Sequence, residues 1–129
     1  MNTFQRTMVA AMTTAATVLS TLALAPTVQA DALAGPLVLG EHQDLGGAQW
    51  NYTSSQTRLG SAGDRASSVR NRDVVAWVLY DDTGHADRHY CIPAGGYIPN
   101  LHDGRWNFGD KTSSVKRLGS NSCRGYPTF

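Results

Sequence analysis

The sequence predicts an all-β sandwich built from two repeated units, and three observations carry that prediction. The run Gly63–Val69, G-D-R-A-S-S-V, recurs 46 residues later as Gly109–Val115, G-D-K-T-S-S-V. Two such copies in a short chain indicate an internal duplication. Apolar segments of strand length alternate with glycine-rich turns. From Asp31 onward, no stretch combines helical periodicity with capping residues.

The first thirty residues have the features of a secretory signal peptide. Arg6 precedes an uncharged apolar stretch over 8–23, and residues 25–30 place small side chains at the −3 and −1 positions of a cleavage site. The apolar part is shorter than a membrane span needs. We therefore expect a signal at residues 1–30 and a secreted, extracellular domain at 31–129.

Composition limits what this domain can bind. Arg6 is the only charged residue of the signal, so residues 31–129 carry ten Arg/Lys and ten Asp/Glu, and a net charge near zero gives no electrostatic footprint for nucleic acid or for an anionic membrane. The length fits one domain with a small core. We expect a monomer.

The two cysteines, Cys91 and Cys123, predict one disulfide, because an even count in a small secreted domain is typical of a cross-link. A metal-thiolate pair and a redox pair are the alternatives. The chain has no C-x-x-C spacing, which disfavours both.

The first half contains three expected strands. Residues 37–39 pair with 48–52 across a turn at 40–47. A polar, glycine-containing loop follows. Residues 67–70 form the returning strand, and 71–73 join the two halves.

The second half begins with a strand at 74–80 that is apolar on both faces and should be covered on both sides. A returning strand at 85–92 ends in the turn Pro93-Ala94-Gly95-Gly96. Residues 97–101 form a short strand in which Pro99 favours an edge position. After a loop at 102–110, the last strand at 113–118 closes the sheet.

These motifs resemble those of the βγ-crystallin Greek-key proteins. That family opens a hairpin with an aromatic–acidic pair, and Tyr80-Asp81 is similar to it. Residues 97–101 resemble the family's G-x-Y-x-x-L strand, and 110–115 resemble its closing loop, N/D-N/D-x-x-S/T-S. In the first half, 40–47 resembles the opening hairpin and 64–69 the closing loop. The resemblance implies a Greek-key β-sandwich of two motifs.

The resemblance covers most of the chain after the signal and divides it into motif one at 37–72, motif two at 73–118 and a tail at 119–129. Asp87 replaces a hairpin glycine, so a positive φ is expected there. The other departures are Gly40, Leu45 and His85 at aromatic positions, and Gly63 and Gly109 at the first position of each closing loop.

The resemblance also implies calcium, which takes six to eight oxygen ligands from carboxylates, hydroxyls and carbonyls. In calcium-binding relatives, the closing loop of one unit and the opening hairpin of the other build each site. The backbone carbonyls of Arg65 and Lys111 would add oxygens. Carried over by position, the pattern nominates Asp64 and Ser67 with Asp81, and Asp110 and Ser113 with Glu41. The alternative is that aspartate and serine in these loops only form Asx and Ser turns that hold the backbone.

Secreted microbial members of this fold include metalloproteinase inhibitors and killer-toxin-like or antifungal proteins. The second half looks most like the inhibitor group, which implies a secreted protease as partner. The candidate contacts are Pro93 and Tyr97 in the loop anchored by Cys91, and Arg105 and Trp106 in the loop at 102–107, because arginine and tryptophan are typical binding anchors.

Catalysis is the weakest of the hypotheses. His85 and His89 have the H-x-x-x-H spacing, but Ala86 stands where a metalloprotease needs glutamate. On a strand, His85, Asp87 and His89 would share a face and form a transition-metal site, or simply a solvated polar face. We therefore expect a non-catalytic binding protein of the peptidase-inhibitor type, with a calcium-binding module or a killer-toxin-like protein as alternatives.

Overall fold

The computed structural model describes residues 35–129, so the predicted signal peptide lies outside the described residues. Seven strands form two antiparallel sheets, as the sequence predicts for an all-β fold. The strands are β1 (Leu37–Gly40), β2 (Gln49–Tyr52), β3 (Ser68–Asn71), β4 (Trp77–Asp82), β5 (Ala86–Ile92), β6 (Tyr97–Ile98) and β7 (Ser114–Arg117).

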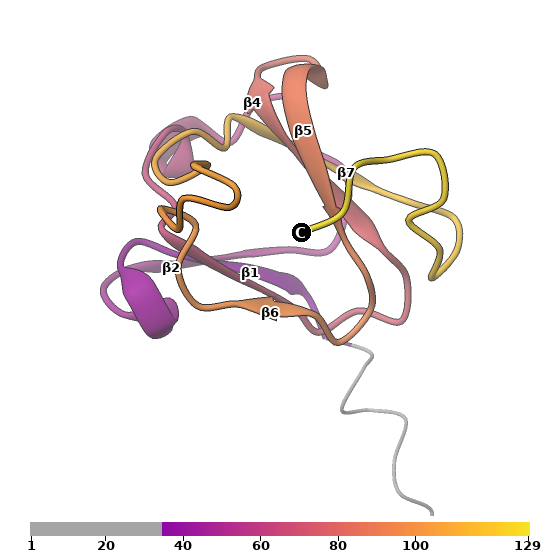
Figure 1. Ribbon diagram of the computed structural model, residues 1–129, viewed down its shortest axis with the longest axis horizontal. Coiled ribbons are helices and arrows are strands. Elements are labelled where there is room, and N and C mark those ends of the chain that lie inside the picture. The colour runs from indigo at the N-terminus through magenta and orange to yellow at the C-terminus, as the bar shows by residue number, and fades with distance from the viewer. Residues whose placement is uncertain (1–34) are drawn as a thin grey trace, which may run out of the picture.

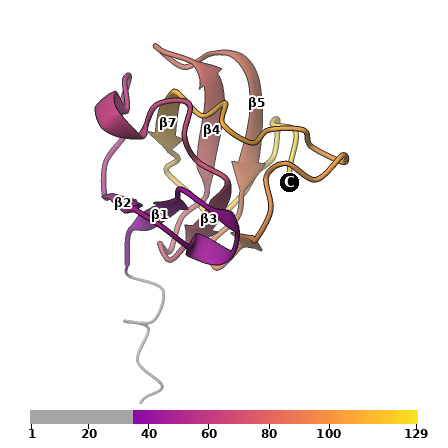
Figure 2. The same cartoon turned by 90° about the vertical axis from the view of Figure 1, so that its left-hand side faces the viewer.

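The two sheets lie one over the other as a sandwich (Figures 1 and 2). Sheet one has the order β2-β1-β3-β6, and sheet two has the order β5-β4-β7. Each sheet, built mainly from one half of the chain, also pairs with a segment from the other half. Strand β6 pairs with β3 of the first half, and Gln56 of the first half bridges Val115 of β7. The two units are therefore interlocked rather than placed side by side.

The core lies between the sheets. Trp77 and Leu79 of β4 pack there against Leu39 and Val69 of sheet one, and all four side chains are fully buried. The alternate residues of β4 form a second small cluster with Ala76 and Cys91 on the other side. The prediction that this strand is covered on both faces is confirmed.

Strand β4 begins three residues later than the apolar pattern predicts, and Asp73 explains why. Its carboxylate accepts hydrogen bonds from the Val74 amide at 2.7 Å and from Trp77 Nε1 at 3.0 Å, and it forms an ion pair with Arg117 at 2.7 Å. Arg117 keeps the Asp73 pKa below its ordinary value. The carboxylate thus fixes a turn, which leaves Val74 exposed instead of in the sheet.

Strand β6 ends at Ile98 because Pro99 cannot donate a ladder hydrogen bond. It lies at the edge of sheet one, as predicted. Two 3₁₀ helices of one turn each, η2 (Gln43–Leu45) and η3 (Gly60–Ala62), were not expected. No helix among residues 35–129 is long and apolar enough to cross a membrane.

The duplication extends to the backbone. Residues in the left-handed region recur at matching places in the two hairpins, namely Leu45 with φ 58° and His85 with φ 57°, then Gly47 and Asp87, both with φ 69°. The positive φ predicted for Asp87 is therefore confirmed. The last serine of each repeated run also has the same role. Ser68 Oγ donates to the His42 carbonyl at 2.6 Å, and Ser114 Oγ donates to the Asp82 carbonyl at 2.6 Å.

The predicted disulfide joins Cys91 to Cys123. It ties the tail to β5, and residues 127–129 run alongside that strand. Their backbone exchanges two hydrogen bonds with Cys91, at 2.7 and 3.0 Å. Phe129 then stacks on Tyr90 with ring centroids 5.0 Å apart.

Candidate cation sites between the two units

The two repeated loops form hydrogen bonds with each other where the two units meet. The Asp64 amide donates to the Thr112 carbonyl at 3.0 Å, and the Asp110 amide donates to the Ala66 carbonyl at 2.8 Å. Both aspartates have a left-handed backbone, with φ 57° and 56°. These reciprocal bonds create two hollows of similar size, about 280 and 310 Å³, one on each side of the crossing.

Each hollow combines the aspartate of one loop with the serine of the other. Ser113 Oγ donates to Asp64 Oδ1 at 2.8 Å, and Ser67 Oγ lies 3.4 Å from Asp110 Oδ1. This grouping differs from the one carried over from the sequence, which kept Asp64 with Ser67 and Asp110 with Ser113. The reason is that each loop crosses from one hollow to the other, so an aspartate and the serine three residues later end on opposite sides.

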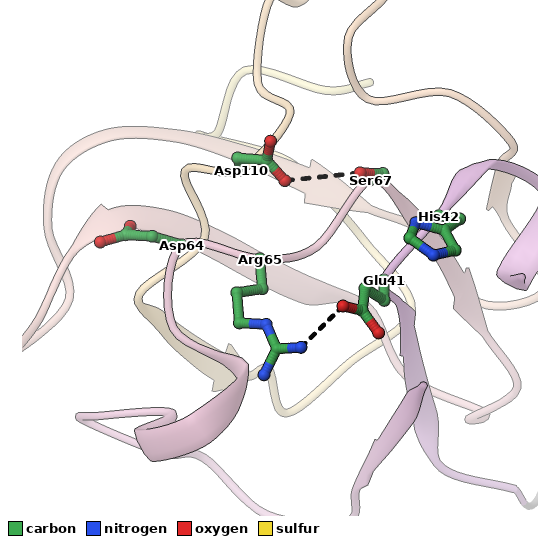
Figure 3. Close-up of a pocket in the computed structure, with 6 residues that line it drawn as sticks. All are labelled: Glu41, His42, Asp64, Arg65, Ser67 and Asp110. Carbon is green, nitrogen blue, oxygen red and sulfur yellow. Dashed lines mark hydrogen bonds and ion pairs between the residues drawn. The ribbon is translucent and has the colours of Figure 1, made fainter. Parts of the chain in front are cut away.

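We call the first hollow site A (Figure 3). Its acidic groups are Glu41 and Asp110, because the carboxylate of Asp64 turns away from both, as Figure 3 shows. Site A is lined by Glu41, His42, Asp64, Arg65, Ser67 and Asp110.

The chain's own cation already neutralises part of site A. Arg65 Nη2 lies 2.6 Å from Glu41 Oε1, and the Ala48 amide donates to the other carboxylate oxygen at 3.1 Å. The hydrogen bond from Arg65 holds the Glu41 pKa below its ordinary value. A calcium ion that binds Glu41 at site A would have to displace the Arg65 guanidinium from this carboxylate.

His102 contacts two side chains of site A from outside its lining, and the sequence analysis did not nominate it. Its Nε2 lies 3.0 Å from Ser67 Oγ and 3.8 Å from Asp110 Oδ2. Gly109 makes room for the ring, since a Cβ there would collide with it. The glycine that departs from the family pattern thus accommodates a histidine seven residues earlier in the chain. Serine and aspartate both face the same ring nitrogen, so the three side chains do not have the order of a Ser-His-Asp triad, which uses both ring nitrogens.

Site B, the second hollow, has a different set of groups. The Asp64 carboxylate accepts the hydrogen bond from Ser113, whose Oγ also lies 3.3 Å from the Lys111 carbonyl oxygen. Asp64 forms no ion pair within residues 35–129. Site B therefore offers a carboxylate, a hydroxyl and a carbonyl, and Arg58, which also lines it, forms no ion pair with Asp64. Its lining comprises Arg58, Leu59, Gly60, Gly63, Asp64, Thr83 and Ser113.

The two acidic residues of the opening hairpins both face arginines. Asp81 Oδ2 lies 3.9 Å from Arg88 Nε and does not line site B. Of the predicted carboxylates, Asp64 and Asp110 thus lie at the crossing, Glu41 faces Arg65, and Asp81 lies apart. In the part of the chain that the structure describes, no three His, Cys, Asp or Glu side chains gather as a metal cluster.

The predicted partner-binding residues contact different sheets. Tyr97 is 39% exposed, with its ring 5.5 Å from the Arg70 guanidinium of sheet one. Arg105 lies over Trp106 at 4.4 Å, and Trp106 contacts Phe129 beside sheet two. Pro93 is exposed in the turn after β5.

His89 of β5 and His85, which directly precedes the strand, both make contacts within the domain. His85 Nε2 lies 2.9 Å from the Val115 carbonyl, and His89 Nδ1 lies 2.9 Å from the Asp87 carbonyl. Both rings pack on Tyr80. The transition-metal site considered for His85, Asp87 and His89 is not assembled.

Comparison with solved structures shows the fold of the chain. A structure described as a beta gamma crystallin from Ciona intestinalis aligns with 65% of this chain and 100% of its own length, at 29% identity and a TM-score of 0.58. A betagamma-crystallin from an archaeon aligns with 66% of this chain and 99% of its own, at 21% identity and a TM-score of 0.58. The N-terminal domain of protein S aligns with 67% of this chain and 99% of its own, at 20% identity and a TM-score of 0.54. No family model and no curated protein sequence matches the chain.

The chain therefore has the βγ-crystallin fold, with two interlocked Greek-key motifs and one disulfide. This confirms the fold that the two repeated runs predict.

Proposed function

We propose that this chain is a secreted, non-catalytic binding domain that takes one calcium ion, at site B. The observation that carries the proposal is the pair formed by Asp64 and Ser113, whose oxygens lie 2.8 Å apart across the junction of the two units. Calcium prefers such hard oxygens and accepts hydroxyl and backbone carbonyl ligands together with few carboxylates. The Lys111 carbonyl oxygen lies 3.3 Å from the Ser113 hydroxyl and adds a third protein oxygen.

Site A fits calcium less well. Arg65 donates to Glu41, and His102 Nε2 lies within contact distance of Ser67 and Asp110, so the oxygens of site A already have partners. A divalent cation there meets an arginine charge at close range, which opposes binding. One ion per chain is therefore expected rather than two.

The test is a melting experiment on the EDTA-treated chain with added calcium, with magnesium as the control ion. A ligand that binds only the folded state stabilises it by about 2.7 kcal/mol at roughly a hundred times its Kd. For a domain of this size, that corresponds to a rise in Tm of about 10 °C or more. An unchanged Tm at millimolar calcium would show that the two loops hold the backbone and bind no metal.

Peptidase inhibition is the second proposed activity, supported by the loop at 102–107. Asp103 binds the Arg105 guanidinium at 3.2 Å, which leaves the arginine side chain 72% exposed on the face of Trp106. Arg88 donates to the carbonyls of Trp106 and Asn107 at 3.3 and 2.6 Å. A loop fixed in this way loses little entropy on binding.

This loop is a series of turns and not an extended segment. It would dock on a peptidase as a shaped surface, with Arg105 as the anchor, and would not enter the cleft as a substrate-like strand.

Titration of a thermolysin-type metalloproteinase with the chain tests this activity. Arg105→Ala should raise the inhibition constant, while Arg124→Ala, which removes another exposed arginine, should leave it unchanged. Full peptidase activity at excess chain would end the inhibitor proposal. A growth-inhibition assay on fungi tests the killer-toxin-like alternative.

A further inference from the structure

Four strands lie at sheet edges, and they are not protected equally. The edge strands are β2 and β6 in sheet one and β5 and β7 in sheet two. An edge strand carries unpaired backbone groups that can pair with another chain, and natural proteins usually cover, shorten or charge such edges.

Three of the four edges have such protection. Tail residues 127–129 cover β5 through the backbone bonds to Cys91. Gln56 covers β7 with two backbone bonds to Val115, at 2.8 and 3.0 Å. Strand β6 has two residues and is followed by Pro99.

Strand β2 has none of these devices. Its four residues pair with β1 in continuous register, without a bulge. Among residues 35–129, its backbone has no hydrogen-bond partner outside β1. Gln49 and Asn51 are exposed, while Trp50 and Tyr52 are half-buried on the side facing the core. From Leu45 to Thr57 the sequence has neither a charged residue nor a proline.

We propose that β2 is a dimerisation edge, at which a second copy of this chain adds its own β2 in antiparallel register about a two-fold axis. The two copies of sheet one would then form one continuous sheet. This surface is independent of the calcium site and of the loop at 102–107. The proposal predicts a dimer, whereas the composition alone suggested a monomer.

Charge matching favours a second copy over a different peptide. A two-fold axis places the neutral stretch 45–57 opposite itself, so no like charges meet. A charged partner strand would find no opposite charge within this stretch. With the axis at Asn51, the same symmetry pairs Trp50 of each copy with Tyr52 of the other, and aromatic cross-strand pairs are favourable.

Sedimentation velocity on the purified chain, from micromolar to near-millimolar concentration, tests this proposal. The expected result is a concentration-dependent species with the mass of two chains. Asn51→Lys places a charge on the exposed face of β2 and should raise the dimer dissociation constant by about fivefold or more, because like charges then face each other. Ala86→Lys adds the same charge at the exposed start of β5 and should leave the constant unchanged.

Hydrogen exchange of the β2 amides provides a second measurement that does not depend on the variant. These amides should exchange more slowly in concentrated than in dilute samples, while the covered edge at Cys91 should show no concentration dependence. A chain that stays monomeric throughout, or a dimer that Asn51→Lys leaves intact, would overturn the proposal. Binding of a different extended peptide without self-association would do so as well.

Discussion

Sites A and B are built from equivalent residues of the two units, yet they present opposite chemistry. Each hollow has an aspartate with a left-handed backbone from one loop and a serine from the other. In site A the chain supplies its own positive group, Arg65, together with His102. In site B the Asp64 carboxylate accepts a hydrogen bond from the Ser113 hydroxyl, and Arg58, which also lines the hollow, forms no ion pair with it. The duplication thus determines where oxygen atoms gather, while single side chains such as Arg65 and His102 determine whether groups of the chain itself contact them.

The largest expected difference between the two sites comes from exchanging their aspartates for asparagines. Asp64→Asn should abolish the stabilisation by calcium, about 2–3 kcal/mol at a hundredfold excess over Kd, because it removes the only carboxylate of site B. Asp110→Asn should retain it. Both residues have φ near 56°, where asparagine is well tolerated, so the two variants are matched in backbone cost. Thermal unfolding with and without calcium measures the difference, and equal losses in the two variants would contradict it.

Replacing the serines should have a smaller effect in the same direction. Ser113→Ala removes a hydrogen bond to Asp64 and should cost about 1 kcal/mol without metal. It should also weaken calcium binding. Ser67→Ala should cost about as much stability but leave calcium affinity unchanged, since its hydroxyl faces Asp110 and His102. Calorimetric titration distinguishes the two. A weaker affinity in Ser67→Ala would mean that the serines belong to the sites in the order predicted from sequence.

Arg65→Gln tests the difference between sites A and B through the number of calcium ions bound per chain. The variant releases Glu41 from its ion pair and should convert one bound calcium per chain into two. Arg65→Lys keeps a positive charge near Glu41 and should stay at one. If the glutamine variant also binds a single ion, then His102 and not Arg65 is what excludes calcium from site A.

The smallest expected effect is a change in acid stability. Because Arg65 lowers the Glu41 pKa below its ordinary value of 4.5, this carboxylate contributes stability above that value and loses it as the pH falls through the lowered pKa. Arg65→Gln should therefore show a weaker decline of Tm in acid than the unmodified chain. The Asp73 and Asp103 carboxyls, whose pKa values are also lowered, are present in both proteins and cancel in the comparison. Identical acid profiles would show that the ion pair contributes nothing to folding.

The sequence was sufficient for the architecture because local patterns determine it. The two G-D-x-x-S-S-V runs, the apolar strand before Tyr80 and the position of Pro99 predicted the sandwich, the twice-covered strand and the edge. These features depend on residues close together in the chain. The late start of β4 was missed because the Asp73 carboxylate competes with the ladder through partners up to 44 residues away.

The candidate sites were less predictable for the same physical reason. Which serine meets which aspartate depends on how two loops cross, over separations of 43 and 49 residues. His102 and Gly109 lie only seven residues apart, but no local pattern indicates that the missing Cβ of the glycine admits the ring. The direction of the Arg65 side chain, which decides the charge of site A, likewise depends on tertiary packing.

The placement of β6 beside β3 has a consequence for half-length molecules. A gene fragment ending at Arg72 would encode a sheet without its fourth strand, and the complementary fragment would leave Val115 without Gln56. Neither product has the serine that its aspartate meets in the whole protein. The two fragments should consequently be unstructured when expressed separately and should regain order by complementation when mixed, so an ancestral single repeat with this topology could have folded only as a pair.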